Sequence, residues 1–242
     1  MSQECTSSFT RGNWSPLNNK GLSRTERTDG RREALPSSAI ILGGGKGRRM
    51  GGNKIYLALD GHLVVETVIK RLPSSFSRII IAAGQNDVPS LETILAPLRQ
   101  WRDIRIISDR NPGRGPLEGM TSALEELEDQ WAFVTGCDMP CIKEAVIRKI
   151  WNSKNPDSSV ACARIGGYIE PLHAFYHKSC IEPARKRLEA SERKLKSFFE
   201  DVNVSVIEEG NLKYLPGYKS SFKSMNTPCD IRSLADFCSL QF

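Results

Sequence analysis

The sequence predicts a single α/β domain in which a mostly parallel central sheet is covered by helices on both faces. Short, continuous apolar runs end at glycine or acidic residues, as fully buried strands do. Amphipathic segments of helical period lie between these runs. Strands and helices therefore alternate along the chain, which is the order that builds a parallel sheet with helices on each face.

Four buried strands are expected where apolar residues run without interruption. The first is AIIL at 39–42, which stops at a run of glycines. The segments RIIIAA at 78–83, IRIIS at 104–108 and WAFVT at 131–135 have the same character. Open α/β sheets bind ligands outside the carboxyl ends of their strands. The residues that directly follow these four segments are therefore the first candidates for a functional site.

The remaining elements follow from periodicity and from capping signals. Asp60-Gly61 is a turn signal, and helical periods predict helices at 64–72, 91–101 (interrupted near Pro97), 117–127 and 145–151. The second half of the chain predicts β-rich segments at 159–163, 171–176 and 203–208, and helices at 181–190 and 194–200. A last helix is expected to begin at Thr227, because a threonine cap is followed by a proline and, three residues on, by an acid.

Composition excludes a membrane-spanning protein and favours anionic partners. The chain has 242 residues, of which 39% are hydrophobic, and no apolar run approaches the ~20 residues of a membrane span. Lys and Arg number 34 and Asp and Glu 28, which gives a net charge of +6. This balance suits nucleic acid, phosphorylated small molecules or a membrane surface. The seven cysteines lack C-x2-C spacing and no secretory signal begins the chain, so we expect reduced thiols and a cytoplasmic location.

Residues 1–36 are expected to form a disordered extension ahead of one folded domain at 37–242. The segment is rich in Ser, Thr, Arg, Gly and Asn and shows neither helical nor strand period. Its small apolar content cannot offset the entropy lost on ordering. An alternative is a basic arm for nucleic acid or a partner protein, but six Lys and Arg are interspersed with four acids, which weakens the field that such an arm needs.

A glycine-rich loop with four cations follows the first strand. Its sequence is LGGGKGRRMGGNK at 42–54, and the cations are Lys46, Arg48, Arg49 and Lys54. Glycines let backbone N–H groups approach phosphates, and the cations neutralise the remaining charge. The loop is neither a P-loop nor the dinucleotide fingerprint, because neither spacing occurs. A solvated turn is the alternative, but this pattern at a strand end favours a polyphosphate site.

Two acids stand at the ends of later strands. Asp138 follows the strand at 131–135, and a buried carboxylate there needs a partner or a metal. Beside a phosphate loop, Mg²⁺ bridging Asp138 and phosphates is the better interpretation, with a helix cap or a core hydrogen bond as the alternative. Asp109 follows the third strand and is equally consistent with a turn. After it, Gly115, Pro116 and Gly119 keep bulky side chains out of a slot for a flat purine.

These segments together resemble the molybdenum cofactor guanylyltransferases. The similarity is carried by LGGGKGRRMGGNK, GPLEGM, the acid in GCDMP and the late NTP, and it covers about residues 38–240. It implies a Rossmann-like domain of the nucleotidyltransferase (glycosyltransferase-A-like) type. The doubled arginine and GPLEGM point to the guanylyl branch, since the cytidylyl branch has Ser or Thr in the loop. The chain departs from the family pattern at Ala82 and Ser224, where asparagines are usual.

The resemblance implies a set of site residues, which stay expectations until tested. The implied GTP contacts are Leu42, Gly43, Gly44, Gly45, Lys54, Asp109 and Asp138. Arg48, Lys54 and Asp138 would be catalytic, with Mg²⁺ on Asp138 as the cofactor. Asn226, and more weakly Arg193, would lie near the pterin. His173 could face the pterin too, although such a histidine is more often structural.

The implied reaction is transfer of GMP from GTP to molybdopterin that carries molybdenum, with release of pyrophosphate. The attacking phosphate is already an anion, so alignment and charge neutralisation can suffice. Alternatives are a cytidylyltransferase for the same pterin, a nucleotidyltransferase for another phosphorylated acceptor, and a non-catalytic GTP-binding subunit. Molybdoenzyme maturation proteins are further candidate partners. Neither nucleic acid nor membrane is expected, because the cations cluster in one loop.

Overall fold

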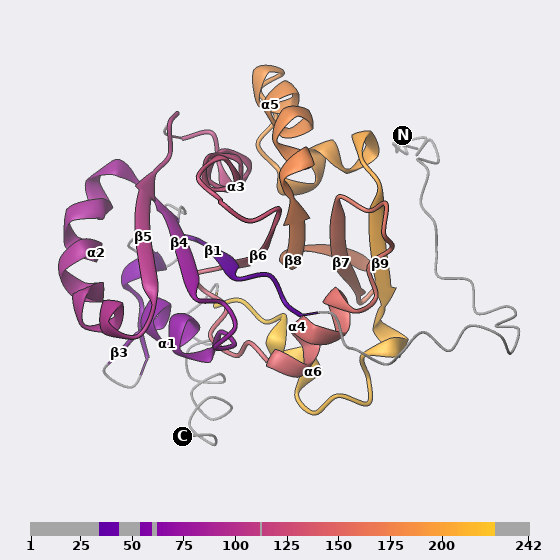
Figure 1. Cartoon of the computed structure of the whole chain (residues 1–242), viewed down its shortest axis with the longest axis horizontal. Helices are drawn as coiled ribbons and strands as arrows, with labels where there is room; N and C mark the ends of the chain where they lie inside the picture. The colour runs from indigo at the N-terminus through magenta and orange to yellow at the C-terminus, as the bar shows by residue number, and fades with distance from the viewer. Residues whose placement is uncertain (1–33, 44–53, 60–61, 112, 226–242) are drawn as a thin grey trace, which may run out of the picture.

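The computed structural model describes residues 34–43, 54–59, 62–111 and 113–225. One seven-stranded sheet crosses the molecule in the order β5-β4-β1-β6-β8-β7-β9 (Figure 1). Strand β8 runs antiparallel to its neighbours β6 and β7, and every other pair in the sheet is parallel. The predicted single α/β domain with a mostly parallel sheet is therefore confirmed. The sheet strands are β1 (Ser38–Leu42), β4 (Arg78–Ala83), β5 (Asp103–Ser108), β6 (Trp131–Gly136), β7 (Val160–Ile165), β8 (Tyr168–His177) and β9 (Val204–Glu208).

Helices cover both faces of this sheet, as the sequence predicts. Helices α3 and α5 lie on one face and α1, α4 and α6 on the other, with α2 at the β5 end (Figure 1). The α3–α5 face buries an apolar cluster that includes Met120, Tyr176 and Phe198, and the opposite face buries one around Phe76 and Phe133. The helices are α1 (Val64–Arg71), α2 (Val88–Leu95), α3 (Pro116–Glu125), α4 (Glu144–Trp151), α5 (Ile181–Glu189) and α6 (Tyr218–Ser221).

Local sequence signals explain where the elements differ from prediction. The interruption expected at Pro97 is real, because α2 ends at Leu95 and a 3₁₀ helix, Ala96–Gln100, continues the segment. The helix expected at 194–200 is instead a 3₁₀ helix, Leu195–Asp201. Two short antiparallel strands, β2 (Ala58–Leu59) and β3 (His62–Leu63), flank the turn signal Asp60-Gly61, which itself lies outside the described residues. Neither these strands nor α6 is predicted, since each is too short to show a period.

The entry of the chain into the fold lies just before β1. Leu35 is buried in the core, two residues ahead of the predicted domain start. The hydroxyls of Ser37 and Ser38 both donate to Asp129 Oδ2, at 2.6 and 2.5 Å. Most of the predicted extension, and the whole of the helix expected from Thr227, lie outside the described residues. No helix in the described part of the chain is long and apolar enough to cross a membrane.

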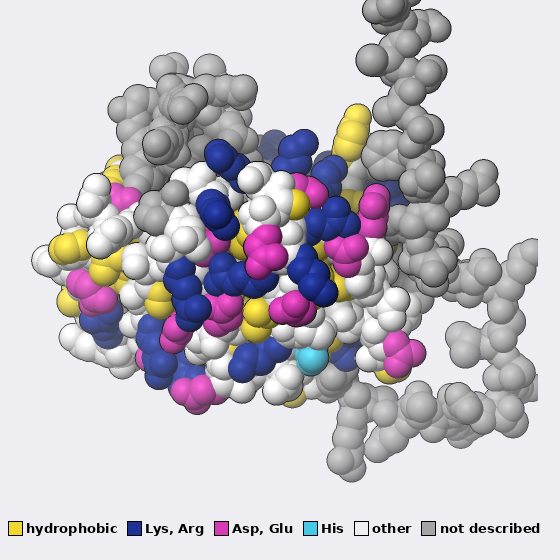
Figure 2. Space-filling model, turned by 90° about the horizontal axis from the view of Figure 1, so that it is seen from above, with side chains coloured by type: hydrophobic (Ala, Val, Ile, Leu, Met, Phe, Trp, Pro, Cys, Tyr) yellow, Lys and Arg dark blue, Asp and Glu magenta, His cyan; other side chains and the backbone are white. Residues whose placement is uncertain are grey.

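Charges of both signs are mixed on the face that carries α3 and α5. Figure 2 shows Lys and Arg side chains interspersed with Asp and Glu over this surface. Many are paired, as in the Arg187–Asp201 ion pair at 2.7 Å and the Arg110–Glu125 pair at 2.8 Å. Among the residues that the structure describes, the positive charges on this face are therefore interspersed with negative ones.

Candidate functional site

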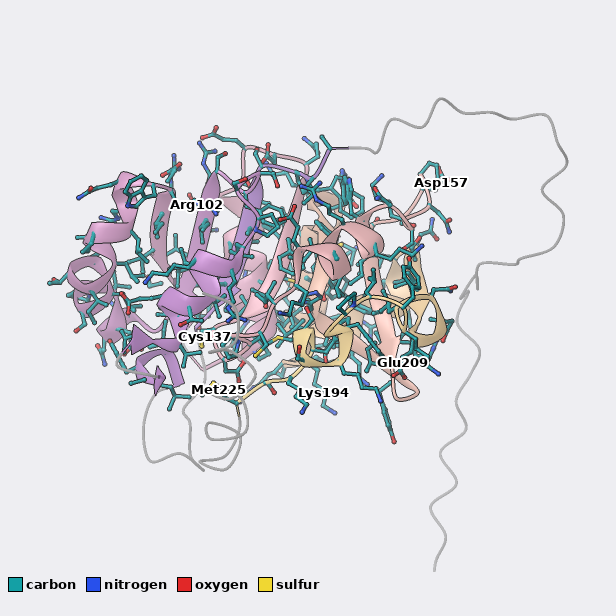
Figure 3. The ribbon with its side chains drawn as sticks, turned by 90° about the horizontal axis from the view of Figure 1, so that it is seen from below. Arg102, Cys137, Asp157, Lys194, Glu209 and Met225 are labelled. Atoms are coloured by element: carbon teal, nitrogen blue, oxygen red, sulfur yellow. The ribbon has the colours of Figure 1, made fainter. Side chains whose placement is uncertain are left out.

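Among the described residues, Leu42, Gly43, Asp109 and Asp138 lie at or just beyond the carboxyl ends of parallel strands. Figure 3 shows Cys137, Met225 and Lys194 along one edge of the molecule, whereas Arg102 and Asp157 lie along the opposite edge. Arg102 directly precedes β5, and Cys137 directly follows β6. The edge that carries Cys137 is therefore the carboxyl edge of the parallel strands. This is the place where open α/β sheets bind ligands.

The end of β1 is tied to its neighbours by the backbone. Gly43 N donates to Ala82 O at 2.7 Å, and Cys137 N donates to Leu42 O at 3.0 Å. These bonds use backbone groups of the two residues that are expected to contact GTP. A nucleotide contact through the Leu42 carbonyl or the Gly43 N–H would therefore share that group with the sheet.

Gly43 also allows Ile55 to pack closely under the strand end. A Cβ at position 43 would collide with Ile55 Cδ1 and lie 3.2 Å from Ala82 O. Ile55 is fully buried, and it belongs to the 3₁₀ helix Lys54–Tyr56. The backbone of Lys54 is therefore anchored beside the end of β1, and its contact with the phosphates stays a prediction. Gly44, Gly45, Arg48, Arg49 and Asn226 lie outside the described residues.

Asp138 lies directly beyond β6, and its side chain is almost completely buried. Only 8% of the residue is exposed, and its Oδ1 lies 2.6 Å from the position that a Cβ on Gly136 would take. Its carbonyl oxygen accepts a hydrogen bond of 2.8 Å from Met225 N. The structure thus brings the segment just before Asn226 to the predicted metal acid, although the two are far apart in sequence.

A second acid near Asp138, Glu170 of β8, was not predicted. Because β8 runs antiparallel to β6, its first residues extend past the carboxyl end of β6. Burial raises the pKa of Glu170, a hydrogen bond from Leu172 N opposes this, and the charge of Asp138 raises the pKa further. No motif distinguishes Glu170 in the sequence, since only the antiparallel turn of the chain brings it back to this edge.

Asp109 occupies the end of β5 with a perturbed carboxyl group. Its N–H donates to Ala83 O at 3.3 Å, which extends the sheet pairing by one residue. Burial, together with the negative charge of Glu118, raises the pKa of Asp109 to about 6. Such perturbation is common among groups in functional sites, although ion-pair networks produce it as well.

Gly119 allows close packing of α3 on the sheet, and the slot for a flat purine expected beside it stays a prediction. A Cβ there would lie 3.1 Å from Asp109 Oδ1, 3.4 Å from Ala82 Cβ and 3.7 Å from Leu42 Cδ2. These atoms come from the ends of β5, β4 and β1. The glycine therefore allows the first turn of α3 to approach three strand ends, two of which carry predicted nucleotide residues, Leu42 and Asp109.

The backbone of Arg193 lies against the same turn of α3. Leu117 N donates to Arg193 O at 3.4 Å, and a Cβ on Gly115 would lie 3.1 Å from Arg193 Cβ. Arg193 itself is exposed. The structure therefore places this residue next to the segment expected to hold the nucleotide, with its side chain at the surface.

His173 is a buried core residue and does not face an open site. Burial lowers its pKa to about 3, its ring packs on Phe133 and Phe222, and its Nε2 lies 3.3 Å from Ser221 Oγ. A neutral imidazole enclosed in this way fits the structural interpretation. Its φ of 66° marks a local irregularity in β8.

The acids at this edge are suitable for Mg²⁺. Mg²⁺ prefers oxygen ligands and is commonly held by one or two carboxylates together with substrate phosphates. Gly136 leaves room for the Asp138 carboxylate, and Glu170 is close enough for the two charges to interact. No group of three or more His, Cys, Asp or Glu side chains among the described residues could hold a metal by itself. The donor set therefore fits a cation whose remaining ligands come from a substrate.

Comparisons with known proteins identify relatives along most of the chain. The profile of the family described as "MobA-like NTP transferase domain" matches residues 39–206. A "Probable molybdenum cofactor guanylyltransferase" from Pelotomaculum thermopropionicum is 31% identical over 81% of this chain and 91% of the relative. The protein of the same description from Peptoclostridium acidaminophilum is 30% identical over 83% and 89%.

Solved structures have the same fold. "Molybdopterin-guanine dinucleotide biosynthesis protein A" from Archaeoglobus fulgidus superposes with a TM-score of 0.69 at 24% identity, covering 84% of this chain and 98% of that one. The "inositol-1-phosphate CTP transferase from T. maritima" gives 0.66 at 14% identity, covering 86% and 96%. Since their names refer to different nucleotides, the shared fold does not by itself choose the base.

Proposed function

Because this chain belongs to the MobA-like NTP transferase family, we propose that it transfers GMP from GTP to molybdopterin carrying molybdenum. The products are the guanine dinucleotide form of the cofactor and pyrophosphate. Membership of the family establishes nucleotidyl transfer as the class of reaction. The choice of guanine as the base and of molybdopterin as the acceptor is our proposal. The observation that carries it is the similarity, at 31% identity over most of both chains, to a protein described as a guanylyltransferase.

The arrangement of the strand ends supports this reaction. The loop that begins at Leu42 and returns at Lys54 leaves from the middle of the carboxyl edge, between β4 and β6. Asp138 stands at the end of the adjacent β6, and Asp109 stands two strands away on the other side. A nucleotide with its phosphates at the loop and its nucleoside toward β5 would lie across this edge. Its α-phosphorus would then be open to the second substrate.

Catalysis in this scheme relies on charge neutralisation and alignment. The terminal phosphate of the pterin is an anion near neutral pH, so it needs no strong general base to attack the α-phosphorus of GTP. Arg48 and Lys54 offset the charge that gathers on the phosphates, and fixed donors of this kind lower the barrier most where charge develops. Asn226, which follows the segment bound to Asp138, and Arg193, which lies at the α3 turn, would hold the pterin.

A divalent cation is part of the proposal. Asp138 would hold Mg²⁺, with Glu170 close enough to strengthen the negative field around it. When bound, Mg²⁺ supplies charge compensation to the phosphate oxygens. The chain contributes an anionic, partly dehydrated position for the ion, and the glycine at 136 gives the carboxylate its space.

A direct assay tests the proposal. The pure protein is incubated with Mg²⁺, molybdopterin and each nucleoside triphosphate in turn, and pyrophosphate release is measured. Release that requires both GTP and the pterin is expected. Release with CTP alone among the nucleotides would identify a cytidylyltransferase, release with another phosphorylated acceptor would replace the pterin, and GTP binding without turnover would indicate a non-catalytic subunit.

A further inference from the structure

Ser221 of α6 is a fully buried serine whose hydroxyl connects three separate elements. Its Oγ accepts a hydrogen bond of 2.9 Å from Lys143 N, the residue that precedes α4. The same Oγ lies 3.3 Å from Nε2 of the buried His173 in β8. Because a buried polar group without a partner costs free energy, these contacts hold α6 against β8 and against the start of α4.

Packing on both sides of Ser221 supports the same arrangement. The ring of Phe222 meets the ring of His173 edge-on, with centroids 4.8 Å apart. At the other end of α6, Gly217 has a φ of 70°, and a Cβ there would lie 3.1 Å from Lys143 Cε. The glycine therefore allows Lys143 to approach the start of α6. Figure 1 shows α6 beside α4 on one face of the sheet.

The segment 218–225, which we call the strap, connects the end of β9 with the turn that carries Asp138. At its start, Tyr218 Oη donates to Glu209 Oε1 at 2.9 Å, and Glu209 directly follows β9. At its end, Met225 is fully buried at the carboxyl edge (Figure 3), and its N–H donates to Asp138 O at 2.8 Å. The contacts within α6 hold the middle of the strap, so they also set the position of its end.

The turn that carries Asp138 is also held without the strap. Cys137 N donates to Leu42 O at 3.0 Å, which joins the turn to β1. Release of the strap would therefore displace Met225 and the residue that follows it more than it would displace Asp138. In the proposed function that following residue, Asn226, contacts the pterin.

We propose that Ser221 and His173 are positioning residues for the acceptor side of the site. By holding the strap on the Asp138 turn, they place the residue that follows Met225 for binding of the pterin. Both side chains are fully buried, so they act through the strap and not by touching a substrate. The inference rests on the proposed function, because it takes Asn226 as a contact of the pterin.

Hydrogen exchange at the backbone amide of Met225, followed by NMR, tests the seating of the strap without any substrate. Ser221→Ala removes the acceptor of the Lys143 N–H. It also removes the polar partner of the His173 ring, whose Nδ1 is buried without a hydrogen bond among the described residues. The Met225 amide should then exchange about tenfold faster or more, because the local opening that exposes it becomes easier.

Two serine variants are matched controls. Ser220→Ala removes the neighbouring hydroxyl of α6, which donates to Gly217 O at 2.7 Å within the same turn. Ser205→Ala removes a buried hydroxyl that also accepts a backbone N–H, that of Asn155 at 2.8 Å, at the amino end of β9. Both controls should leave exchange at Met225 close to that of the unmodified protein, even if Ser205→Ala lowers the melting temperature.

The kinetic measurement separates the two substrates. Ser221→Ala should raise KM for molybdopterin by about tenfold while the Kd for GTP with Mg²⁺ stays unchanged, because the strap end lies on the acceptor side. His173→Asn is the second variant if Ser221→Ala does not fold. Asparagine tolerates the φ of 66° at this position, and it lacks the ring that reaches Ser221. It should show the same faster exchange and the same rise in KM.

Three results would overturn the inference while leaving the proposed function intact. They are unchanged Met225 exchange in a folded Ser221→Ala or His173→Asn protein, an equal acceleration in Ser205→Ala, and faster exchange with an unchanged KM for molybdopterin. Absence of pyrophosphate release from the unmodified protein with GTP and molybdopterin would instead contradict the proposed function. The exchange rates would still show whether Ser221 holds the strap.

Discussion

The carboxylate of Asp138 lies over Gly136, with Oδ1 only 2.6 Å from the point where a methyl group on that glycine would stand. The two residues share the tight turn that ends β6, and that turn is closed by the hydrogen bond from Met139 N to Gly136 O at 3.3 Å. A side chain at 136 would push the carboxylate from its place. The sequence Gly-Cys-Asp therefore holds the acid at the strand end, where it is nearly buried.

Asp138→Asn should lower turnover by ~10²-fold or more while the fold stays intact, because the change removes one charge from the proposed cation site. Steady-state rates at several Mg²⁺ concentrations and a thermal melt provide the measurement. Asp157→Asn is the matched control, since Asp157 is exposed and lies on the opposite edge of the sheet (Figure 3). If the Asp138→Asn variant kept half of the original rate at ordinary Mg²⁺, the assignment of Asp138 as a ligand of the metal would be contradicted.

Gly43→Ala should destabilise the protein by about 1–3 kcal/mol, the usual cost of forcing an extra methyl group into a packed region. The new Cβ would press on Ile55 and on the carbonyl of Ala82, and it would move the segment that begins at Lys54. We therefore expect a raised KM for GTP in addition to a lower melting temperature. Gly210→Ala is the control, because no atom lies within 4 Å of a Cβ at that position. Equal melting temperatures for the two variants would contradict the packing argument.

Much of the sheet could be predicted because apolar runs are a local signal. The segment RIIIAA forms a strand at the predicted residues, and the strands ending at Leu42 and near Thr135 differ from prediction by a residue. Their order in the sheet was not predicted. It depends on contacts between residues far apart in sequence, such as the parallel register of Ile40 with both Ile80 and Val134.

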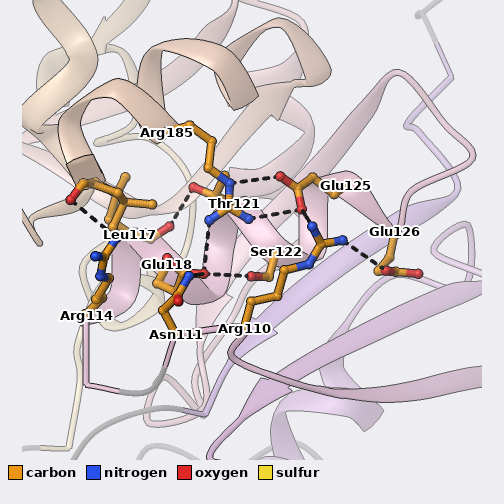
Figure 4. Close-up of polar contacts among 11 residues, drawn as sticks. Arg110, Asn111, Arg114, Leu117, Glu118, Thr121, Ser122, Glu125, Glu126 and Arg185 are labelled. Atoms are coloured by element: carbon orange, nitrogen blue, oxygen red, sulfur yellow. Dashed lines mark hydrogen bonds and ion pairs between the residues drawn. The ribbon is translucent and has the colours of Figure 1, made fainter.

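Site residues could be predicted where they stand at a recognisable place in a sequence motif. They could not be predicted where the burial and contacts of a side chain depend on tertiary packing. Asp109 and Asp138 stand at strand ends, which a sequence shows directly. The acid Glu118 looks like an ordinary first-turn residue of a helix, yet its side chain has no exposed surface because α5 brings Arg185 over it (Figure 4). The close packing of Gly119 against the ends of β5, β4 and β1 also depends on tertiary contacts that the local sequence does not show.

Removal of residues 1–32 should leave both the melting temperature and turnover nearly unchanged. We propose that these residues lie outside the folded domain, on the basis of their composition. Removal of residues 1–36 should instead lower the melting temperature by several degrees, because it deletes the buried Leu35 from the core. The melting temperature and the turnover rate of each deletion variant are measured, and together they locate the start of the folded domain. A large loss in the shorter deletion would show that the terminal segment belongs to the fold.

The last prediction is that GTP is preferred to ATP, CTP and UTP. Guanine presents an N1–H and a 2-amino group as adjacent donors, whereas adenine lacks this pair. The carboxyl of Asp109, which directly follows β5, is one candidate acceptor for these donors. A site built on such acceptors discriminates because the wrong base leaves them without donors, at a cost of about 1–3 kcal/mol for each buried group.

That cost corresponds to ~10-fold to over 100-fold in kcat/KM for each unpaired acceptor. Competition among the four nucleotides at equal concentration, with molybdopterin and Mg²⁺ present, gives the ratio directly. Asp109→Asn is the informative variant, because an amide still accepts through its oxygen but carries no charge and adds two donors. If Asp109 contacts the base, the variant has a smaller ratio of kcat/KM between GTP and ATP. If Asp109 contacts the ribose, kcat/KM falls by a similar factor for all four nucleotides. A preference for CTP would assign the chain to the cytidylyl branch, with the fold and the Asp138 site unchanged.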